Sequence, residues 1–76
     1  MTNETLPTSE VLWRLRQGHL HGEIRVTHGA INHDIEVEVA GEIIGRAAVP
    51  PGKDWSKVAD DMRQVCLKRG WTSAES

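Results

Sequence analysis

All four histidines of the chain lie in one short segment, between His19 and His33. Histidine is the commonest metal ligand and the usual pH switch, so this cluster is the first candidate for chemistry. His19 and His21 are two residues apart, which would place both imidazoles on one face of a strand. A third ligand would have to be an acidic neighbour such as Glu38 or Glu42, and that is a weak pattern for zinc. We therefore expect no functional metal and no cofactor.

Other catalytic patterns are weaker still. Serine and threonine lie mostly in the two terminal segments, outside any nucleophile-elbow context. The segment 50–56 has one glycine and one lysine but lacks the spacing of a phosphate-binding loop. The single cysteine, Cys66, falls on an apolar helical stripe, where a thiol is usually a small buried hydrophobe. We therefore expect a protein that is not an enzyme.

The length and composition indicate one folded unit. A chain of 76 residues forms a single domain over 1–76, in which we expect residues 1–7 and 72–76 to be flexible. Phenylalanine and tyrosine are absent, so Trp13, Trp55 and Trp71 must supply the aromatic part of the core. The formal net charge of −2 argues against general nucleic-acid binding, which needs many cationic groups.

Nothing in the sequence indicates a membrane or an export signal. The first ten residues contain neither a basic n-region nor an apolar h-region. No apolar run approaches the roughly 20 residues that a helix needs to cross a bilayer. We expect a cytoplasmic protein that does not bind membranes.

The segment 8–17 allows two structures. Thr8 or Ser9 can cap a short helix and Gly18 can follow its end, which favours a helix. The residues 11–16 also alternate between two sides in the way that a strand does. We expect the helix here and leave the strand as the alternative.

The rest of the chain predicts three strands and one helix. Alternation of apolar and polar residues predicts strands at about 20–28, 34–40 and 42–49. Asp54 can then cap an amphipathic helix over 55–69. The expected fold is therefore α+β: a short N-terminal helix, a three-stranded antiparallel β-meander, and the C-terminal helix packed on one sheet face.

The register follows from keeping the apolar residues on one face. A hairpin around residues 29–32 pairs His28 with His33, Val26 with Ile35, Ile24 with Val37 and Gly22 with Val39. A turn at 40–42 then pairs Val39 with Ile43, Val37 with Gly45 and Ile35 with Ala47. The face that carries these pairs should receive the C-terminal helix.

This register divides the histidines into two pairs. His28 and His33 face each other at the base of the hairpin loop, on the apolar side. His19 and His21 lie on the other face at the far end of the strand, so the four cannot converge on one ion. Protonation of both His28 and His33 would place like charges side by side, and we expect mild acid to loosen this end of the hairpin.

The other face of the expected sheet is acidic. It should carry five carboxylates against Arg25 and Arg46; these are Glu23, Asp34, Glu36, Glu38 and Glu42. One interpretation is a solvated face that keeps the protein soluble. The other is a docking surface for a protein or nucleoprotein partner with a basic surface. Ile44 and Ala48 would supply an apolar contact or a dimer seam there.

The sequence also resembles known families. The order α-β-β-β-α and the run 35–62, IEVEVAGEIIGRAAVPPGKDWSKVADDM, resemble a double-stranded-RNA-binding domain. That resemblance implies phosphate contacts at Lys53 and Lys57, although the dense lysine cluster of the family is missing. The run IEVEVAGEIIGRA with one amphipathic helix is similar to small phage-encoded anti-CRISPR proteins, which implies a non-enzymatic inhibitor acting by surface occlusion.

The leading hypothesis is a small cytoplasmic interaction protein that binds a protein or nucleoprotein partner through its acidic face, as a phage-type inhibitor would. The alternatives are a double-stranded-RNA-binding module and a homodimeric accessory subunit. The sequence allows a monomer or a homodimer and makes nucleic acid the less favoured partner.

Overall fold

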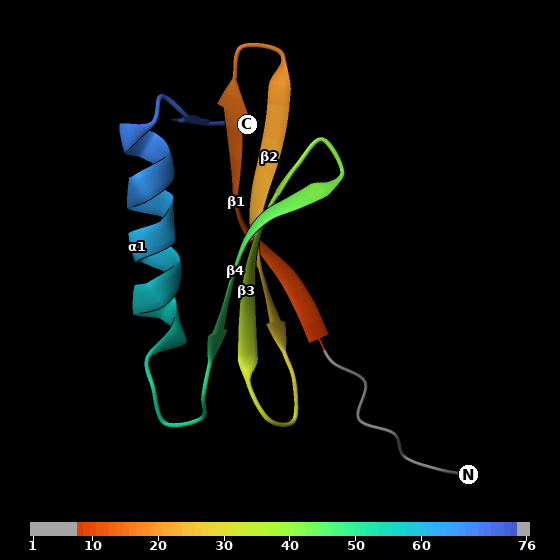
Figure 1. Cartoon of the computed structure of the whole chain (residues 1–76), viewed down its shortest axis with the longest axis vertical. Coiled ribbons are helices and arrows are strands. Elements are labelled where there is room, and N and C mark those ends of the chain that lie inside the picture. The colour runs from red at the N-terminus through yellow and green to blue at the C-terminus, as the bar shows by residue number, and fades with distance from the viewer. Residues whose placement is uncertain (1–7, 75–76) are drawn as a thin grey trace, which may run out of the picture.

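A computed structural model describes residues 8–74 as an antiparallel sheet with one helix across one face (Figure 1). The strands are β1 (Thr8–Gln17), β2 (Leu20–His28), β3 (His33–Val39), β4 (Glu42–Val49) and β5 (Thr72–Ser73), and the helix is α1 (Trp55–Lys68). The order across the sheet is β4-β3-β2-β1-β5, so β4 and the short β5 form the two edges.

The expected N-terminal helix is wrong, because residues 8–17 form strand β1. The sheet therefore has five strands instead of a three-stranded meander with a helix before it. A helix of ten residues is marginal by itself. As a strand, the same segment pairs with β2 along its length and places Leu15 in the core, where it is 1 % exposed. Burial and strand pairing therefore outweigh the local signals for a helix.

Gly18 shows why the first segment is ambiguous. It has a positive φ of 61°, which suits a residue after a helix and equally suits a tight hairpin turn. Gln17 pairs with Leu20, so Gly18 and His19 form a two-residue loop. Only the first loop residue has a positive φ, which is the pattern of a type II′ turn with glycine in its first central position.

The β2–β3 hairpin has the predicted register. His28 pairs with His33, Val26 with Ile35, Ile24 with Val37 and Gly22 with Val39. The loop between the strands is closed by a hydrogen bond from the Gly29 N–H to the Asn32 carbonyl, at 2.9 Å. The period-two pattern was sufficient here because a shift of one residue would expose half of the apolar side chains.

The β3–β4 hairpin differs from the prediction at its turn. Ala40 and Gly41 both have positive φ, 51° and 85°, which is the pattern of a type I′ two-residue turn. Val39 therefore pairs with Glu42, and the expected Val39–Ile43 pair is wrong. The register shifts at Ile44, after which Val37 pairs with Gly45 and Ile35 with Ala47, as predicted. The extra residue of this β-bulge compensates for the shorter loop.

Helix α1 begins and ends close to the predicted positions. The Asp54 carboxylate accepts hydrogen bonds from the backbone N–H groups of Ser56 and Lys57, at 3.1 and 3.3 Å. The last turn is closed by bonds from the Gly70 N–H to the Leu67 carbonyl and from the Trp71 N–H to the Cys66 carbonyl, which is a Schellman motif. This motif turns the chain back toward the sheet.

The core lies between α1 and one face of the sheet. Its buried members are Leu15, Ile24, Val26, Ile35, Val37, Val49 and Ala59. All three tryptophans pack against this cluster, as predicted. Val65 of the helix is 48 % exposed, because the helix leaves one flank uncovered.

The segment after the helix is ordered where a loose tail was expected. Thr72 pairs with Arg16 and Ser73 with Leu15, so β5 caps the C-terminal half of β1. The Ala74 N–H adds a hydrogen bond to the Arg14 carbonyl at 2.9 Å. Residues 1–7, also expected to be flexible, lie outside the described part of the chain, as do 75–76.

Candidate interaction surfaces

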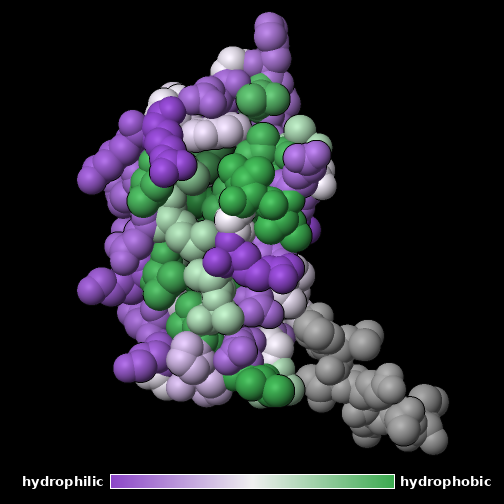
Figure 2. Space-filling model, viewed as in Figure 1, coloured by the Kyte–Doolittle hydropathy of each residue, from purple (hydrophilic) through white to green (hydrophobic). Residues whose placement is uncertain are grey.

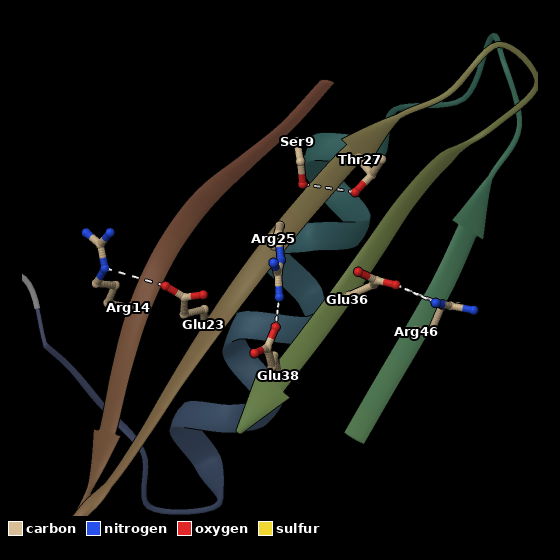
Figure 3. Close-up of polar contacts among 8 residues, drawn as sticks. All are labelled: Ser9, Arg14, Glu23, Arg25, Thr27, Glu36, Glu38 and Arg46. Atoms are coloured by element: carbon tan, nitrogen blue, oxygen red, sulfur yellow. Dashed lines mark hydrogen bonds and ion pairs between the residues drawn. The ribbon is translucent and has the colours of Figure 1, made fainter. Parts of the chain in front are cut away.

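The face of the sheet away from the helix carries a ladder of ion pairs (Figure 3). Arg14 Nε lies 3.6 Å from Glu23 Oε2, and Arg46 Nε donates to Glu36 Oε2 at 3.1 Å. Arg25 pairs with Glu38 between them. We call this surface the open face. Its charged side chains lie over four strands, β1 to β4, and point toward one another.

The predicted acidic surface is partly balanced by these arginines. Glu23 lies directly opposite Glu38, and Arg25 opposite Glu36, as the register predicted. Arg25 nevertheless pairs diagonally with Glu38, which relieves the like-charge contact between the two glutamates. The hydrogen bond from Arg46 to Glu36 also raises the pKa of the Arg46 guanidinium. Three of the five carboxylates are therefore already paired within the chain.

The other two carboxylates are separated from each other. Asp34 pairs in register with Ala48 on the open face, and the described contacts give it no ion pair. Glu42 pairs in register with Val39, which belongs to the helix-covered side. The bulge in β4 is the physical reason, because an extra residue reverses which face each earlier side chain takes. The structure thus does not bring the five predicted acidic residues together on one face.

The bulge also separates Ile44 from Ala48, the predicted apolar contact. Ile43 takes the register position opposite Glu38, on the open face. Ile44 lies on the helix side, where it lines a groove with Met62 and Val65. Val65 was not predicted as a surface residue, because helical periodicity alone places it on the buried stripe, whereas the half-buried Met62 packs against the core and also lines the groove.

This groove is lined mainly by apolar side chains. It has a volume of about 200 Å³ and lies between β4 and α1; its lining residues are Val37, Ile44, Gly45, Met62, Val65, Cys66 and Arg69. Figure 2 shows hydrophobic surface gathered between the helix and the strands, with hydrophilic side chains along the outer side of the helix. We call this surface the β4 groove.

Strand β4 borders the β4 groove as an unpaired edge. Among residues 8–74 no strand lies beyond it, so part of its backbone N–H and C=O groups faces outward. Ile43 is 50 % exposed and Ile44 is 60 % exposed on this strand. Cys66 borders the groove floor, and burial raises the pKa of its thiol, so it stays in the protonated form that packs as a small hydrophobe.

A second hollow lies between the C-terminal half of β1, the start of β2 and the β3–β4 turn. It has a volume of about 470 Å³, and its lining includes Arg14, Arg16, His21, Glu23 and Glu38. Arg14 is held by Glu23, and Glu38 is held by Arg25. The hollow therefore offers mainly Arg16 and His21 to a ligand, which is a sparse set of polar groups for a small-molecule site.

The register correctly predicted the pair of His28 and His33, whereas His19, expected on the strand beside His21, lies in the β1–β2 loop. His28 and His33 lie side by side, with their Nδ1 atoms 2.8 Å apart. His21 pairs in register with Arg16, near the opposite end of β2. Within the described residues no group of three His, Cys, Asp or Glu side chains is placed to hold a metal ion.

The lysines suggested by the resemblance to RNA-binding domains lie at the start of α1. Lys53 and Lys57 are both exposed, and the Lys57 N–H is held by the Asp54 cap. The element order behind that resemblance begins with a helix, whereas this chain has β1 there. RNA binding through these lysines stays a prediction.

The helix of the described chain gives no indication of a membrane span, since it is too short and too polar to cross one. Comparisons of this sequence with protein-family models, with curated proteins and with solved structures find no match. The proposed function therefore rests on the surfaces of the molecule.

Proposed function

We propose that this protein is a small, non-enzymatic interaction module that binds an extended segment of another protein along β4. The observation that carries the proposal is the combination of an unpaired strand edge with an apolar groove beside it. An added strand would pair with the backbone of β4 while alternate side chains enter the groove. This is a familiar way for a sheet to recognise a peptide.

The groove also indicates what the bound segment should contain. Ile44, Met62 and Val65 favour a branched or aromatic side chain, because burying these apolar groups is the main source of affinity. Arg69 lines the same groove and would favour an acidic residue nearby in the segment. The preferred partner is therefore an extended apolar segment with a neighbouring Asp or Glu.

The open face is less suited to be the main contact. Its carboxylates Glu23, Glu36 and Glu38 already have arginine partners, and a basic partner would have to displace them. Displacement of paired charges gives little net affinity. An inhibitor of the phage type, acting in the cytoplasm by surface occlusion, is one role that such a binding module would serve.

A random peptide library displayed on phage tests the proposal directly. Selection on the purified chain should enrich short peptides that alternate apolar residues and carry an acidic residue. Ile44→Asp should weaken their binding about tenfold or more, as the loss of an interface anchor does. Val11→Asp is the matched control, because Val11 is a partly exposed apolar residue on β1, which is separated from β4 by two strands.

Three outcomes would contradict the proposal. Equal losses in Ile44→Asp and Val11→Asp would show that the groove has no special role. Loss of binding only in Glu36→Lys with Glu38→Lys would assign the function to the open face. Binding of an RNA duplex at low salt, weakened by Lys53→Ala with Lys57→Ala, would favour the nucleic-acid alternative. Sedimentation of the free chain separates all of these from self-association.

A further inference from the structure

Two histidines at one end of the sheet form a direct contact that the proposed function does not use. His28 ends β2 and His33 begins β3, and their Nδ1 atoms are 2.8 Å apart. A hydrogen bond between two ring nitrogens requires a proton on one of them and a free lone pair on the other. The pair therefore depends on its protonation state in a way that a single histidine does not.

The pair also joins two segments that are distant in the sequence. The His28 ring packs edge-on against the Trp55 ring, with centroids 5.0 Å apart, and the His33 and Trp55 centroids are 6.1 Å apart. Trp55 is the first residue of α1 and follows the Asp54 cap. The histidine pair thus connects the β2–β3 hairpin loop to the start of the helix.

The surroundings indicate which nitrogen carries the proton. Glu10 Oε1 of β1 lies 3.9 Å from His28 Nε2, and a carboxylate favours a proton on the nitrogen that faces it. Neutral His28 then has a free Nδ1, which accepts from the Nδ1–H of His33. This assignment leaves His33 Nε2 as the lone pair that can take up the next proton.

Among the other groups around the two histidines, none supplies a second carboxylate to the described contacts. Strand β4 contributes Val49, the register partner of His33, and α1 contributes Trp55. Asp34 is adjacent to His33 but pairs in register with Thr27 on the open face, whereas the Asp54 carboxylate is held by helix N–H groups. Glu10 is the acidic group that the described contacts place against the pair, through the His28 ring.

We propose that His28 and His33 form a latch that accepts one proton and is opened by a second. The first proton binds His33 Nε2 and leaves the bond from His33 Nδ1–H to His28 Nδ1 in place. The second proton must bind His28 Nδ1, where it displaces that bond and sets two charged rings against each other. Opening would separate His28 and His33, at the base of the loop 29–32, from Trp55 at the start of α1.

The latch predicts coupled titration of the two rings. Groups that interact this closely release their protons in two separate steps that belong to the pair. The loop should stay ordered after the first step and loosen after the second.

The test is an NMR titration of the full chain from pH 8.0 to 4.5. At the upper pH, the ring ¹⁵N shifts should show a protonated Nδ1 on His33 and an unprotonated Nδ1 on His28. During the second step, the Trp55 indole N–H and the Gly29 amide should shift together. Protection of the Gly29 amide, corrected for the pH dependence of exchange, should fall roughly tenfold, the factor for one pK unit of coupling. The Ala40 amide, which bonds to the His21 carbonyl at the opposite hairpin end, is the internal reference.

The variant His33→Asn provides the control. Its side-chain amide can donate to neutral His28 or accept from protonated His28, so the acid-induced opening should disappear. If this variant is poorly folded, His28→Asn tests the same point from the other strand. Identical tautomers on the two wild-type rings, an unchanged loop at pH 4.5, or the same opening in a folded Asn variant would each overturn the proposal.

Discussion

The two sides of the sheet differ in whether their outer long strand is covered by a further strand. The outer side of β1 is capped at its C-terminal half by β5, and the Thr72 hydroxyl donates to the Arg16 carbonyl at 3.2 Å. The outer side of β4 has no such cap among the described residues and exposes Ile43 and Ile44. An edge that is capped contributes to stability, whereas an edge that is left bare and apolar is available for binding.

The bare edge is nevertheless protected against uncontrolled pairing. The bulge at Ile44 interrupts the regular pattern of β4, and Pro50 follows the end of the strand. Bulges and prolines are common devices that prevent a free edge from recruiting any strand. The capped edge at β1 therefore serves stability, and the bare edge at β4 admits only certain binding segments. Substitutions at each edge can test this difference.

The largest expected effect is the loss of stability when Leu15 is truncated, compared with Ile44. Leu15 of β1 is 1 % exposed, so Leu15→Ala should lower the free energy of unfolding by about 3 kcal/mol through lost burial and an unfilled cavity. Ile44→Ala should cost less than about 1 kcal/mol, because the side chain is 60 % exposed. Urea denaturation measures both. Equal costs would show that the two edges do not differ in this way.

A smaller effect is expected where the capped edge meets Trp71. A side chain at Gly22 would lie 3.3 Å from Trp71 Cζ3 and 3.2 Å from the Glu38 carbonyl oxygen. Gly22→Val should therefore destabilise the protein by about 2 kcal/mol through overpacking and displace Trp71. Calorimetry measures the stability and tryptophan fluorescence reports the displacement. Gly45→Ala, on the bare edge strand β4, is the control, because a Cβ there would have its nearest contacts at ordinary distances, from 3.8 Å upward.

The smallest predicted effect concerns the turn that leads into the bare edge. Ala40 has a positive φ of 51°, which strains an alanine but suits asparagine. Ala40→Asn should therefore stabilise the chain by about 0.5 kcal/mol. Thermal unfolding tests this, and destabilisation would show that the type I′ turn is not formed in solution. Peptide binding should remain unchanged, because Ala40 does not line the β4 groove.

Much of the fold could be read from local patterns. The alternation in residues 34–40 and the turn around 29–32 were sufficient for the full β2–β3 register. The helix predicted over 55–69, with Asp54 as its cap, agrees with α1 within one residue at each end. These features are local, since each depends on residues that are close in the sequence.

The candidate site could be predicted only in part. Ile44 was expected on the open face with Ala48, whereas it lies on the helix side and lines the β4 groove with Met62 and Val65. This arrangement depends on the bulge in β4 and on where the helix lies across the sheet, which no periodicity specifies. The ion-pair partners of the open-face carboxylates could not be predicted from the register either. Arg25 pairs with the diagonal Glu38 although Glu36 lies directly opposite it.

The sequence by itself determined the amphipathic helix, the central hairpin and the pairing of His28 with His33. Tertiary structure decided the rest: that residues 8–17 form a strand, that Ile44 is bulged, and that residues 72–73 cap the edge. In each of these cases the local preference is nearly balanced between two conformations. Burial and hydrogen bonding with strands far along the chain then select one of them.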